Sequence, residues 1–381
     1  MRLLFTFAGG EGHLQPMLPL ARTAAAAGHQ VTVTGARSLG PTVRGAGLEF
    51  VATGPDVRPQ RRALQAIDME NEYRVVREHF AGRLAAARAA ALLPLCQDLR
   101  PDVVVRDEID FGSAVVAERL GIPHASVIVI GAGSFVKPAR IAEPLSLLRA
   151  TYGLPADPDL LMLARYLVLS PFPATFRDPG DPLAPTAHYF RSEPNPPRGV
   201  GSRLLDQLAG RRVLYITLGT IFNTESGDLF SRVLDGARRL PIEVVVTVGR
   251  GVDPAELGPQ PPHVHVEQYV PQSLLLPHCD AVLNHAGSGS VLGALDHGLP
   301  MVCVPMGADQ ALNAARCTAL GVGQELDARM LTPDDVLAAT SAALTEPRYR
   351  DAAARLAAEI SAMPSTGDAV ALLEQLADRP T

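Results

Sequence analysis

The chain has 381 residues, which is enough for two ordinary domains, because a single hydrophobic core rarely grows beyond about 250–300 residues. With 47% hydrophobic and 19% charged residues the composition is that of a globular protein and excludes disorder. A net charge of −6 and the lack of any apolar run of about 18–20 residues exclude nucleic acid and membranes as expected partners.

Cysteine usage and the N-terminus indicate a cytoplasmic protein. The run MRLLFTFAGGEGH is typical of a first β-strand rather than of a signal peptide. No Cys-x-x-Cys pair occurs, so we expect reduced thiols and no structural zinc at the four cysteines, Cys96, Cys279, Cys303 and Cys317.

The first half of the chain alternates strand-like and helix-like stretches. Short apolar strands are predicted at residues 2–8, 30–35, 101–107 and 124–131, with helices at 16–29 and 111–121. Continuous apolar strands separated by helices indicate a parallel sheet that is covered on both faces.

The alternation stops and then restarts in the second half. Proline and glycine accumulate from about Pro171 to Gly201, which predicts a linker. Further strands are then predicted at 212–219, 242–249, 263–270, 281–284 and 301–307, with helices at 227–240 and over much of 334–363. We therefore predict two doubly wound domains, with ligands in a central cleft at the carboxyl ends of the strands.

The stretch NHAGSGSVLG at 284–293 raises the question of NAD binding. Its glycines are spaced much like a dinucleotide-binding turn, and Asp309 lies 20 residues beyond Gly289 (309 − 289). However, His285 precedes the glycines, and Asp309 lies four residues after Pro305 (309 − 305), on a predicted loop rather than at a strand end. An NAD-dependent oxidoreductase thus stays an alternative.

The same loops suit a sugar diphosphate. The free N–H groups at the start of the helix after this turn favour phosphate, and the histidine and two serines add donors. Asp309 and Gln310 offer hydrogen bonds to sugar hydroxyls, although Asp309 could instead cap the helix that follows. Tyr269, just before Val270 and Pro271, could stack on a base or be a packed loop residue.

Four segments together resemble the C-terminal signature of family 1 glycosyltransferases of the GT-B fold, specifically the bacterial natural-product enzymes of antibiotic, macrolide and enediyne type. They are Y-V-P-Q at 269–272, H-A-G-S-G-S at 285–290, G-A-L-D-H-G-L-P at 293–300 and P-M-G-A-D-Q-A-L-N-A at 305–314. The resemblance implies two Rossmann-like domains: 1–200 for the acceptor and 201–362 for the nucleotide sugar. A C-terminal helix in 363–381 would pack back on the first domain.

The resemblance also implies roles for individual residues of the second domain. The base and ribose would contact Tyr269, Val270 and Gln272, the sugar hydroxyls Asp309 and Gln310, and the phosphates Thr220, His285, Gly287, Ser288, Gly289 and Ser290. Gly293 stands where plant relatives carry a ribose-binding glutamate, so a dTDP-sugar is as compatible as a UDP-sugar. The Asp-Gln pair resembles that of glucose users, and the donor stays open.

His13 in the loop AGGEGHLQP matches the family's catalytic base. Displacement at an anomeric carbon requires deprotonation of the acceptor hydroxyl, and neutral histidine suits this near pH 7. Asp107, at the end of the predicted strand 101–107, matches the carboxylate that orients the base, with Glu108 and Asp110 close by. Taken alone, His13 could be a turn residue and Asp107 a helix cap.

Two segments of the first domain, 53–82 and 131–175, match acceptor-binding regions of the family. A hydrophobic acceptor would suit their larger side chains, which could equally be core: Met69, Tyr73, Phe80, Phe135, Met162 and Tyr166. The only D-x-D motif, Asp157-Pro158-Asp159, lies in a proline-rich stretch and is interpreted as a turn, so we expect no metal and no other cofactor.

The sequence therefore predicts an inverting, metal-independent transferase that moves a hexose or deoxyhexose from a UDP- or dTDP-sugar to a hydroxyl of a hydrophobic secondary metabolite. It would act as a monomer or homodimer. The alternatives are the oxidoreductase and a non-catalytic protein that keeps the fold.

Overall fold

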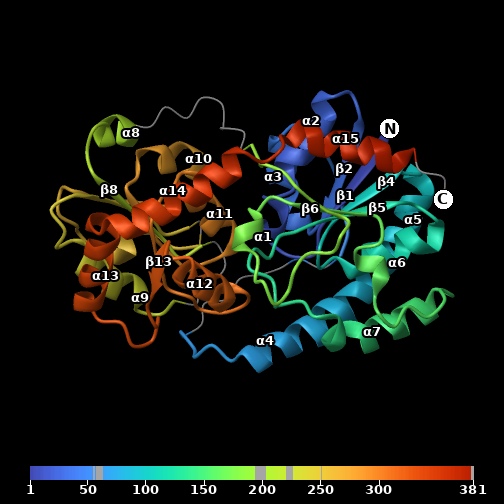
Figure 1. Cartoon of the computed structure of the whole chain (residues 1–381), viewed down its shortest axis with the longest axis horizontal. Helices are drawn as coiled ribbons and strands as arrows, with labels where there is room; N and C mark the ends of the chain where they lie inside the picture. Colours follow the sequence, from blue (N-terminus) through green and yellow to red (C-terminus); the bar gives the residue numbers. More distant parts are fainter. Residues whose placement is uncertain (55, 57–62, 194–202, 220–225, 250, 379–381) are drawn as a thin grey trace. The chain divides into compact units, whose positions relative to one another are not determined.

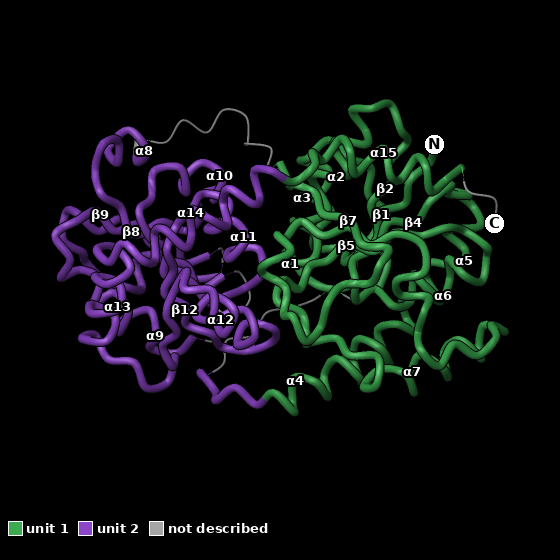
Figure 2. Tube along the Cα trace, viewed as in Figure 1, with its two compact units in different colours: residues 1–58, 69–193, 363–381 green, residues 59–68, 194–362 purple. Residues whose placement is uncertain are grey.

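Two parallel β-sheets organise the chain, one in each of two compact units (Figures 1 and 2). The structure, a computed structural model, describes residues 1–54, 56, 63–193, 203–219, 226–249 and 251–378. Unit 1 comprises residues 1–58, 69–193 and 363–381, and unit 2 comprises 59–68 and 194–362.

The sheet of unit 1 has the strand order β3-β2-β1-β4-β5-β6-β7, and all its pairs are parallel. Its strands are β1 (Arg2–Thr6), β2 (Gln30–Gly35), β3 (Glu49–Ala52), β4 (Val103–Asp107), β5 (His124–Val127), β6 (Leu167–Ser170) and β7 (Ala187–Tyr189). Its longer helices are α2 (Leu18–Ala26), α3 (Gly40–Gly45), α4 (Met69–Val75), α5 (Ala85–Leu99), α6 (Phe111–Leu120), α7 (Pro138–Thr151) and α15 (Thr366–Ala377). A one-turn helix, α1 (Glu11–Leu14), follows β1, and a π-helix (Val76–Leu84) joins α4 to α5.

The sheet of unit 2 has the order β10-β9-β8-β11-β12-β13, again with parallel pairs. Its strands are β8 (Val213–Thr217), β9 (Glu243–Thr247), β10 (Val264–Glu267), β11 (Ala281–Asn284), β12 (Met301–Cys303) and β13 (Gly323–Glu325). Its helices are α8 (Arg203–Leu208), α9 (Leu229–Ala237), α10 (Gln272–Leu275), α11 (Ser288–Asp296), α12 (Gln310–Ala319), α13 (Pro333–Thr345) and α14 (Pro347–Ser361).

The central strands are buried on both faces, as strands in parallel sheets covered by helices should be. Every residue of β4, β8, β9 and β11 is buried. The prediction of two doubly wound parallel-sheet α/β domains is confirmed.

The last helix belongs to unit 1. Ser365 and Asp368 form a capping box that starts α15, and the apolar face of this helix joins the core that contains α2, with Val370 and Leu373 buried (Figure 1). The Arg191 N–H donates to the Pro364 carbonyl at 2.7 Å and fixes the chain where it returns to unit 1.

The proline-rich segment from Pro171 differs from the predicted linker. Its residues up to 193 belong to unit 1 and include the edge strand β7. Proline is tolerated beside an edge strand, because one side of that strand makes no ladder hydrogen bonds. Three residues are also too few to produce a visible hydrophobic pattern.

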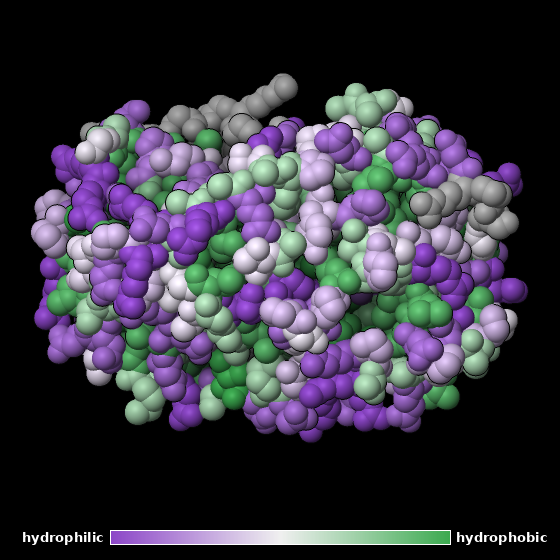
Figure 3. Space-filling view, viewed as in Figure 1, coloured by the Kyte–Doolittle hydropathy of each residue, from purple (hydrophilic) through white to green (hydrophobic). Residues whose placement is uncertain are grey.

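The surface is mixed in polarity. On the face seen in Figure 3, hydrophilic and hydrophobic residues are interspersed. Exposed large hydrophobic residues occur at scattered points of the described chain: Val75, Leu147, Leu161, Tyr269 and Met330. Among the described residues, no helix has both the length and the apolar character needed to span a bilayer.

Candidate active site

His13 lies in α1, which follows β1, and Asp107 is the last residue of the neighbouring strand β4. β1 pairs with β4, so the loop after Thr6 and the end of Val103–Asp107 meet at one edge of the sheet. His13 Nδ1 lies 3.2 Å from Asp107 Oδ2, and the histidine side chain is 22% exposed while that of Asp107 is fully buried. The histidine therefore has one ring edge toward a carboxylate and access to solvent.

Backbone N–H groups hold the Asp107 carboxylate. Its Oδ1 accepts from the N–H groups of Ile109 and Asp110, both at 2.7 Å, and its Oδ2 accepts from that of Ala8 at 2.8 Å. The N-cap of α6 is Asp110, whose side chain accepts from Ser113 N. Asp107 is thus not a helix cap, and its orientation is fixed from three directions.

Glu108, the neighbouring carboxylate, points elsewhere. Its Oε1 accepts from the N–H groups of Val129 at 2.7 Å and Ile130 at 2.6 Å, which anchors the chain after β5. Burial raises the pKa of Glu108 to about 7, against the opposing effect of the Arg177 guanidinium and these two N–H groups.

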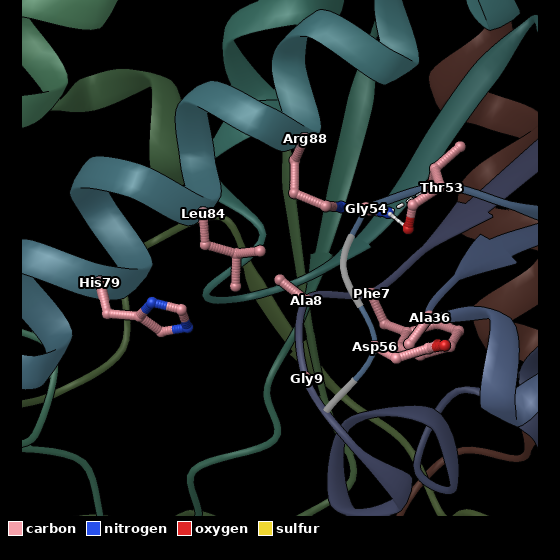
Figure 4. A pocket seen from close by; sticks show the side chains of 10 residues that line it. All are labelled: Phe7, Ala8, Gly9, Ala36, Thr53, Gly54, Asp56, His79, Leu84 and Arg88. Atoms are coloured by element: carbon pink, nitrogen blue, oxygen red, sulfur yellow. Dashed lines mark hydrogen bonds between the residues drawn. The ribbon is translucent and has the colours of Figure 1, made fainter. Parts of the chain in front are cut away.

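A cavity of about 210 Å³ lies at the ends of β1, β2 and β3 (Figure 4). Its wall is mainly apolar, with polar groups from α5, the π-helix and the loop after β3. It also borders Gly9, where an added Cβ would come within 2.3 Å of His13 Cδ2. The lining residues are Phe7, Ala8, Gly9, Ala36, Thr53, Gly54, Asp56, His79, Leu84 and Arg88.

None of the six predicted acceptor residues lines this cavity, but Phe80 contacts His13, and Tyr73 and Phe135 contact each other. Phe80 on the π-helix stacks on the His13 ring, with centroids 6.4 Å apart and planes at 28°. Tyr73 lies 6.0 Å from Phe135, ring to ring, with the Arg140 guanidinium 3.4 Å from the Tyr73 centroid.

The remaining three predicted acceptor residues lie apart from the cavity. Met162 is buried and its Sδ accepts from Arg149 at 3.0 Å, and Tyr166 packs edge-on against His124. Met69 begins α4. Asp157 of the D-x-D motif accepts the N–H groups of Leu161 and Met162, as a turn residue would.

In unit 2, His285 follows β11 and is packed between two glycines. A Cβ at Gly219 or Gly287 would come within 2.5 or 2.4 Å of its Nε2. Burial lowers the pKa of His285 to about 4, although a hydrogen bond with the Thr217 backbone works in the opposite direction. The ring is therefore neutral near pH 7.

Helix α11 begins three residues after this histidine (288 − 285). Its N-cap is Gly287, which provides no side-chain cap, and Ser288 is its first residue. Gln272 Nε2 donates to Ser290 Oγ at 3.5 Å, so α10 and α11 are linked at their first turns. The backbone N–H groups that start α11, including those near Gly289, suit an anionic ligand.

Asp309 stands at the N-cap position of α12 but its carboxylate makes no cap hydrogen bond. Instead its Oδ2 accepts from Ser288 Oγ at 2.7 Å and from Asn313 Nδ2 at 2.8 Å. Asn313, which is fully buried, also donates to the Ala286 carbonyl at 2.9 Å. Asn313 was missed in the sequence, where it looks like any polar residue of an amphipathic helix.

Each of the two turns that carry these groups contains an alanine with a positive φ angle. Ala286 and Ala308 have φ values of +59° and +53°, the left-handed region that non-glycine residues seldom occupy. Such backbone strain is concentrated at ligand sites. Gln310 holds the second turn, since its Oε1 accepts from the Met306 N–H at 2.8 Å.

The predicted base-binding residues differ in exposure. Tyr269 is 53% exposed, whereas Val270 is buried. Gln272 starts α10, and its Nε2 lies 3.5 Å from the Tyr215 hydroxyl. Thr220 lies outside the described residues.

Comparison with known proteins identifies the class. Residues 231–376 match the family described as erythromycin biosynthesis protein CIII-like, C-terminal domain. The chain is 30% identical to 4'-demethylrebeccamycin synthase of Lentzea aerocolonigenes over 98% of its length and 99% of the relative's. It is 33% identical to L-demethylnoviosyl transferase of Streptomyces niveus over 86% and 85% of the two chains.

Solved structures agree over the whole chain. The glycosyltransferase SnogD from Streptomyces nogalater has a TM-score of 0.81 at 29% identity, covering 99% of both chains. Glycosyltransferase SsfS6 of Streptomyces sp. SF2575, solved with thymidine diphosphate, has a TM-score of 0.78 at 28% identity, covering 98% of this chain and 99% of that one.

The two sheets and these neighbours define a glycosyltransferase of the GT-B fold. Within that class, the chain belongs to the bacterial natural-product glycosyltransferases of family 1. The predicted family is thus confirmed, and the chain is a glycosyltransferase rather than an oxidoreductase or a non-catalytic protein.

Proposed function

We propose that this enzyme transfers a hexose or deoxyhexose, with inversion, from a thymidine or uridine diphosphate sugar to a hydroxyl of a hydrophobic natural product. The observation that carries the proposal is the 3.2 Å approach of His13 Nδ1 to Asp107 Oδ2 in unit 1. A carboxylate at Nδ1 keeps the proton on that nitrogen, so Nε2 is the basic one.

In the proposed reaction, His13 Nε2 removes the acceptor proton as the acceptor oxygen attacks the anomeric carbon. The new carbon–oxygen bond forms while the bond from that carbon to the diphosphate oxygen breaks, and the pair of electrons leaves with the diphosphate. Asp107 orients the imidazole and stabilises the imidazolium that forms. Attack from the face opposite the leaving group inverts the anomeric centre.

The donor would bind to unit 2. The N–H groups at the start of α11, neutral His285 and the hydroxyl of Ser290 would receive the diphosphate. Asp309, held by Ser288 and Asn313, would accept hydroxyls of the sugar. Because these groups are donors and dipoles, the leaving charge would be stabilised with no metal ion.

The thymidine nucleotide is the better-supported donor. The SsfS6 structure, at 28% identity over nearly the whole chain, holds thymidine diphosphate. Gly293 places no carboxylate beside the ribose position, so a missing 2′-hydroxyl would leave no buried acceptor unpaired. Tyr269, largely exposed at the start of the motif, would stack on the base.

The test combines binding and turnover. Thermal unfolding is measured with TDP, UDP, TDP-glucose and UDP-glucose, because a ligand that binds only the native state raises its stability. Glycoside formation from a panel of aglycones is then followed by mass spectrometry for the enzyme, His13→Ala, Asp107→Asn and the control His188→Ala, a surface histidine of β7.

The kcat of both active-site variants should fall at least about 100-fold, because general acid–base catalysis contributes on this scale. The kcat of the control should stay unchanged. Near-normal turnover by His13→Ala at neutral pH would contradict the proposed base. A product that retains the anomeric configuration of the donor, seen by NMR, would contradict inversion.

A further inference from the structure

Arg88, on α5, is a fully buried arginine at the edge of the cavity in unit 1. Its side chain is 2% exposed and pairs with Asp110, with Nη2 2.6 Å from Asp110 Oδ2. The guanidinium also donates to the hydroxyl groups of Thr6 and Thr53 and, at 3.1 Å, to the Thr53 carbonyl. One side chain thus joins the ends of β1 and β3 to the turn after β4.

Close approach of two helices brings Arg88 to this place. α5 packs against α6, where Gly112 leaves the space: an added Cβ would lie 2.4 Å from the Ala85 carbonyl oxygen and 2.7 Å from Arg88 Cβ. A side chain at position 112 would therefore push the arginine away from Asp110.

Asp110 connects Arg88 to the proposed catalytic pair. Its carboxylate accepts from Arg88 and from the Thr6 hydroxyl, while its backbone N–H donates to Asp107 Oδ1 at 2.7 Å. The same carboxylate caps α6 through Ser113. The side chain of Asp110 is therefore held by Arg88, while its backbone N–H donates to Asp107.

We propose that Arg88 is a positioning residue of the transfer reaction: through Asp110 it fixes the turn at 107–110 and so holds Asp107 against His13. This inference rests on the proposed function of that pair. Arg88 itself contacts no reacting atom.

Charge gives a reason for an arginine at this position. Asp107 and Asp110 are both fully buried and three residues apart in one turn, and two carboxylates so placed repel each other. Burial alone raises the pKa of Asp110, but Arg88 and the hydrogen bonds to Asp110 bring it below its ordinary value. With Asp110 paired to Arg88, Asp107 is the carboxylate that faces His13 and can stabilise an imidazolium.

The experiment compares two buried carboxylates at opposite ends of α6, Asp110 and Glu118. Asp110→Asn keeps an oxygen for the cap but breaks the charge pair with Arg88, and Arg88→Lys keeps the charge but loses the planar fork. Glu118→Gln is the matched control, since Glu118 pairs with buried Arg149 at 2.9 Å and lies outside the 107–110 turn.

Two readouts separate positioning from simple stabilisation. The tautomer of His13 is read from the ¹⁵N chemical shifts of labelled histidine, with no substrate present. The kcat, KM and pH profile are measured with TDP-glucose as donor probe and 4-methylumbelliferone as acceptor probe. Circular dichroism reports whether each variant is folded.

We expect the wild-type enzyme and Glu118→Gln to hold the Nδ1–H tautomer, and Arg88→Lys and Asp110→Asn to show a mixture. For these two variants kcat should fall about 10- to 100-fold, with KM little changed. Loss of a residue that orients a functional side chain has an effect of this size in metalloenzymes. The acid limb of the pH profile should also move for them but not for the control.

Folded Arg88→Lys and Asp110→Asn enzymes with the wild-type tautomer and the kcat of Glu118→Gln would overturn the proposal. If neither single variant folds, the double variant Arg88→Met/Asp110→Asn decides by the same tautomer measurement, because replacing both members of a buried pair is often tolerated. A shifted tautomer together with normal turnover by His13→Ala would instead refute the proposed base and leave the positioning intact.

Discussion

Replacing Glu108 by glutamine should make unit 1 less sensitive to pH. Both N–H groups that bind Glu108 donate to the same oxygen, Oε1, and a glutamine carbonyl oxygen can accept both. Arg177, whose positive charge opposes the raised pKa of Glu108, keeps its ion pair with Asp181 at 2.8 Å. The substitution therefore removes a titrating group while it conserves the contacts around it.

The size of the effect follows from the raised pKa of Glu108. The folded protein holds the proton up to a pH of about 7, whereas an ordinary glutamate releases it near 4.5. The stabilising contribution of the protonated carboxyl is therefore complete below pH 4.5 and is lost as the pH rises through 7. At about 1.36 kcal/mol per pH unit, the difference corresponds to about 3 kcal/mol for a fully buried group.

Hydrogen exchange of the β4 and β5 amides, corrected for intrinsic rates, measures the stability of unit 1 separately. Between pH 5 and pH 8 the wild-type unit should lose up to about 3 kcal/mol relative to Glu108→Gln. Parallel pH profiles for the two proteins would show that Glu108 ionises normally and would refute the reasoning.

Three further predictions concern the two candidate sites and the core of unit 1. Gly9→Ala should reduce kcat at least about 100-fold, since an added Cβ would strike the proposed base, whereas Gly12→Ala, with no atom within 4 Å of its Cβ, should stay active. Asn313→Ala should raise the donor KM about 10-fold, because Asp309 loses a fixed partner, and an unchanged KM would argue against a donor role for this network. Leu373→Ala should destabilise unit 1 by about 2–5 kcal/mol in the same exchange experiment and leave α9 and β8 unaffected.

Much of the fold could be predicted because its strands are short, apolar and separated by helices. The run VVVRD at the end of the predicted strand 101–107 is β4, and the predicted strand 30–35 coincides with β2. The π-helix could not be predicted, because its residues are those of an ordinary helix. β7 was missed because an edge strand of three residues among prolines produces no periodic pattern.

The residues of the candidate site could also be predicted only in part from the sequence. His13 and Asp107 could be proposed from their motifs, but their 3.2 Å approach depends on the pairing of β1 with β4, which joins segments about a hundred residues apart. Arg88 lies in an alanine-rich helix, where an arginine predicts an exposed face. Only the folded chain shows that it is buried and paired. The catalytic and donor roles stay predictions.

The return of α15 to unit 1 affects how such enzymes can be recombined. Because α2 and α15 share one core while residues 194–362 belong to unit 2, this larger part of unit 2 is covalently an insert between two parts of unit 1, and only the short segment 59–68 of unit 2 lies elsewhere in the chain. A chimera with a single crossover near residue 193 would pack a foreign last helix against the parent's α2. Exchange of residues 194–362 calls for two crossovers, near 193 and 362, so that unit 1 keeps its own final helix, while residues 59–68 stay those of the parent.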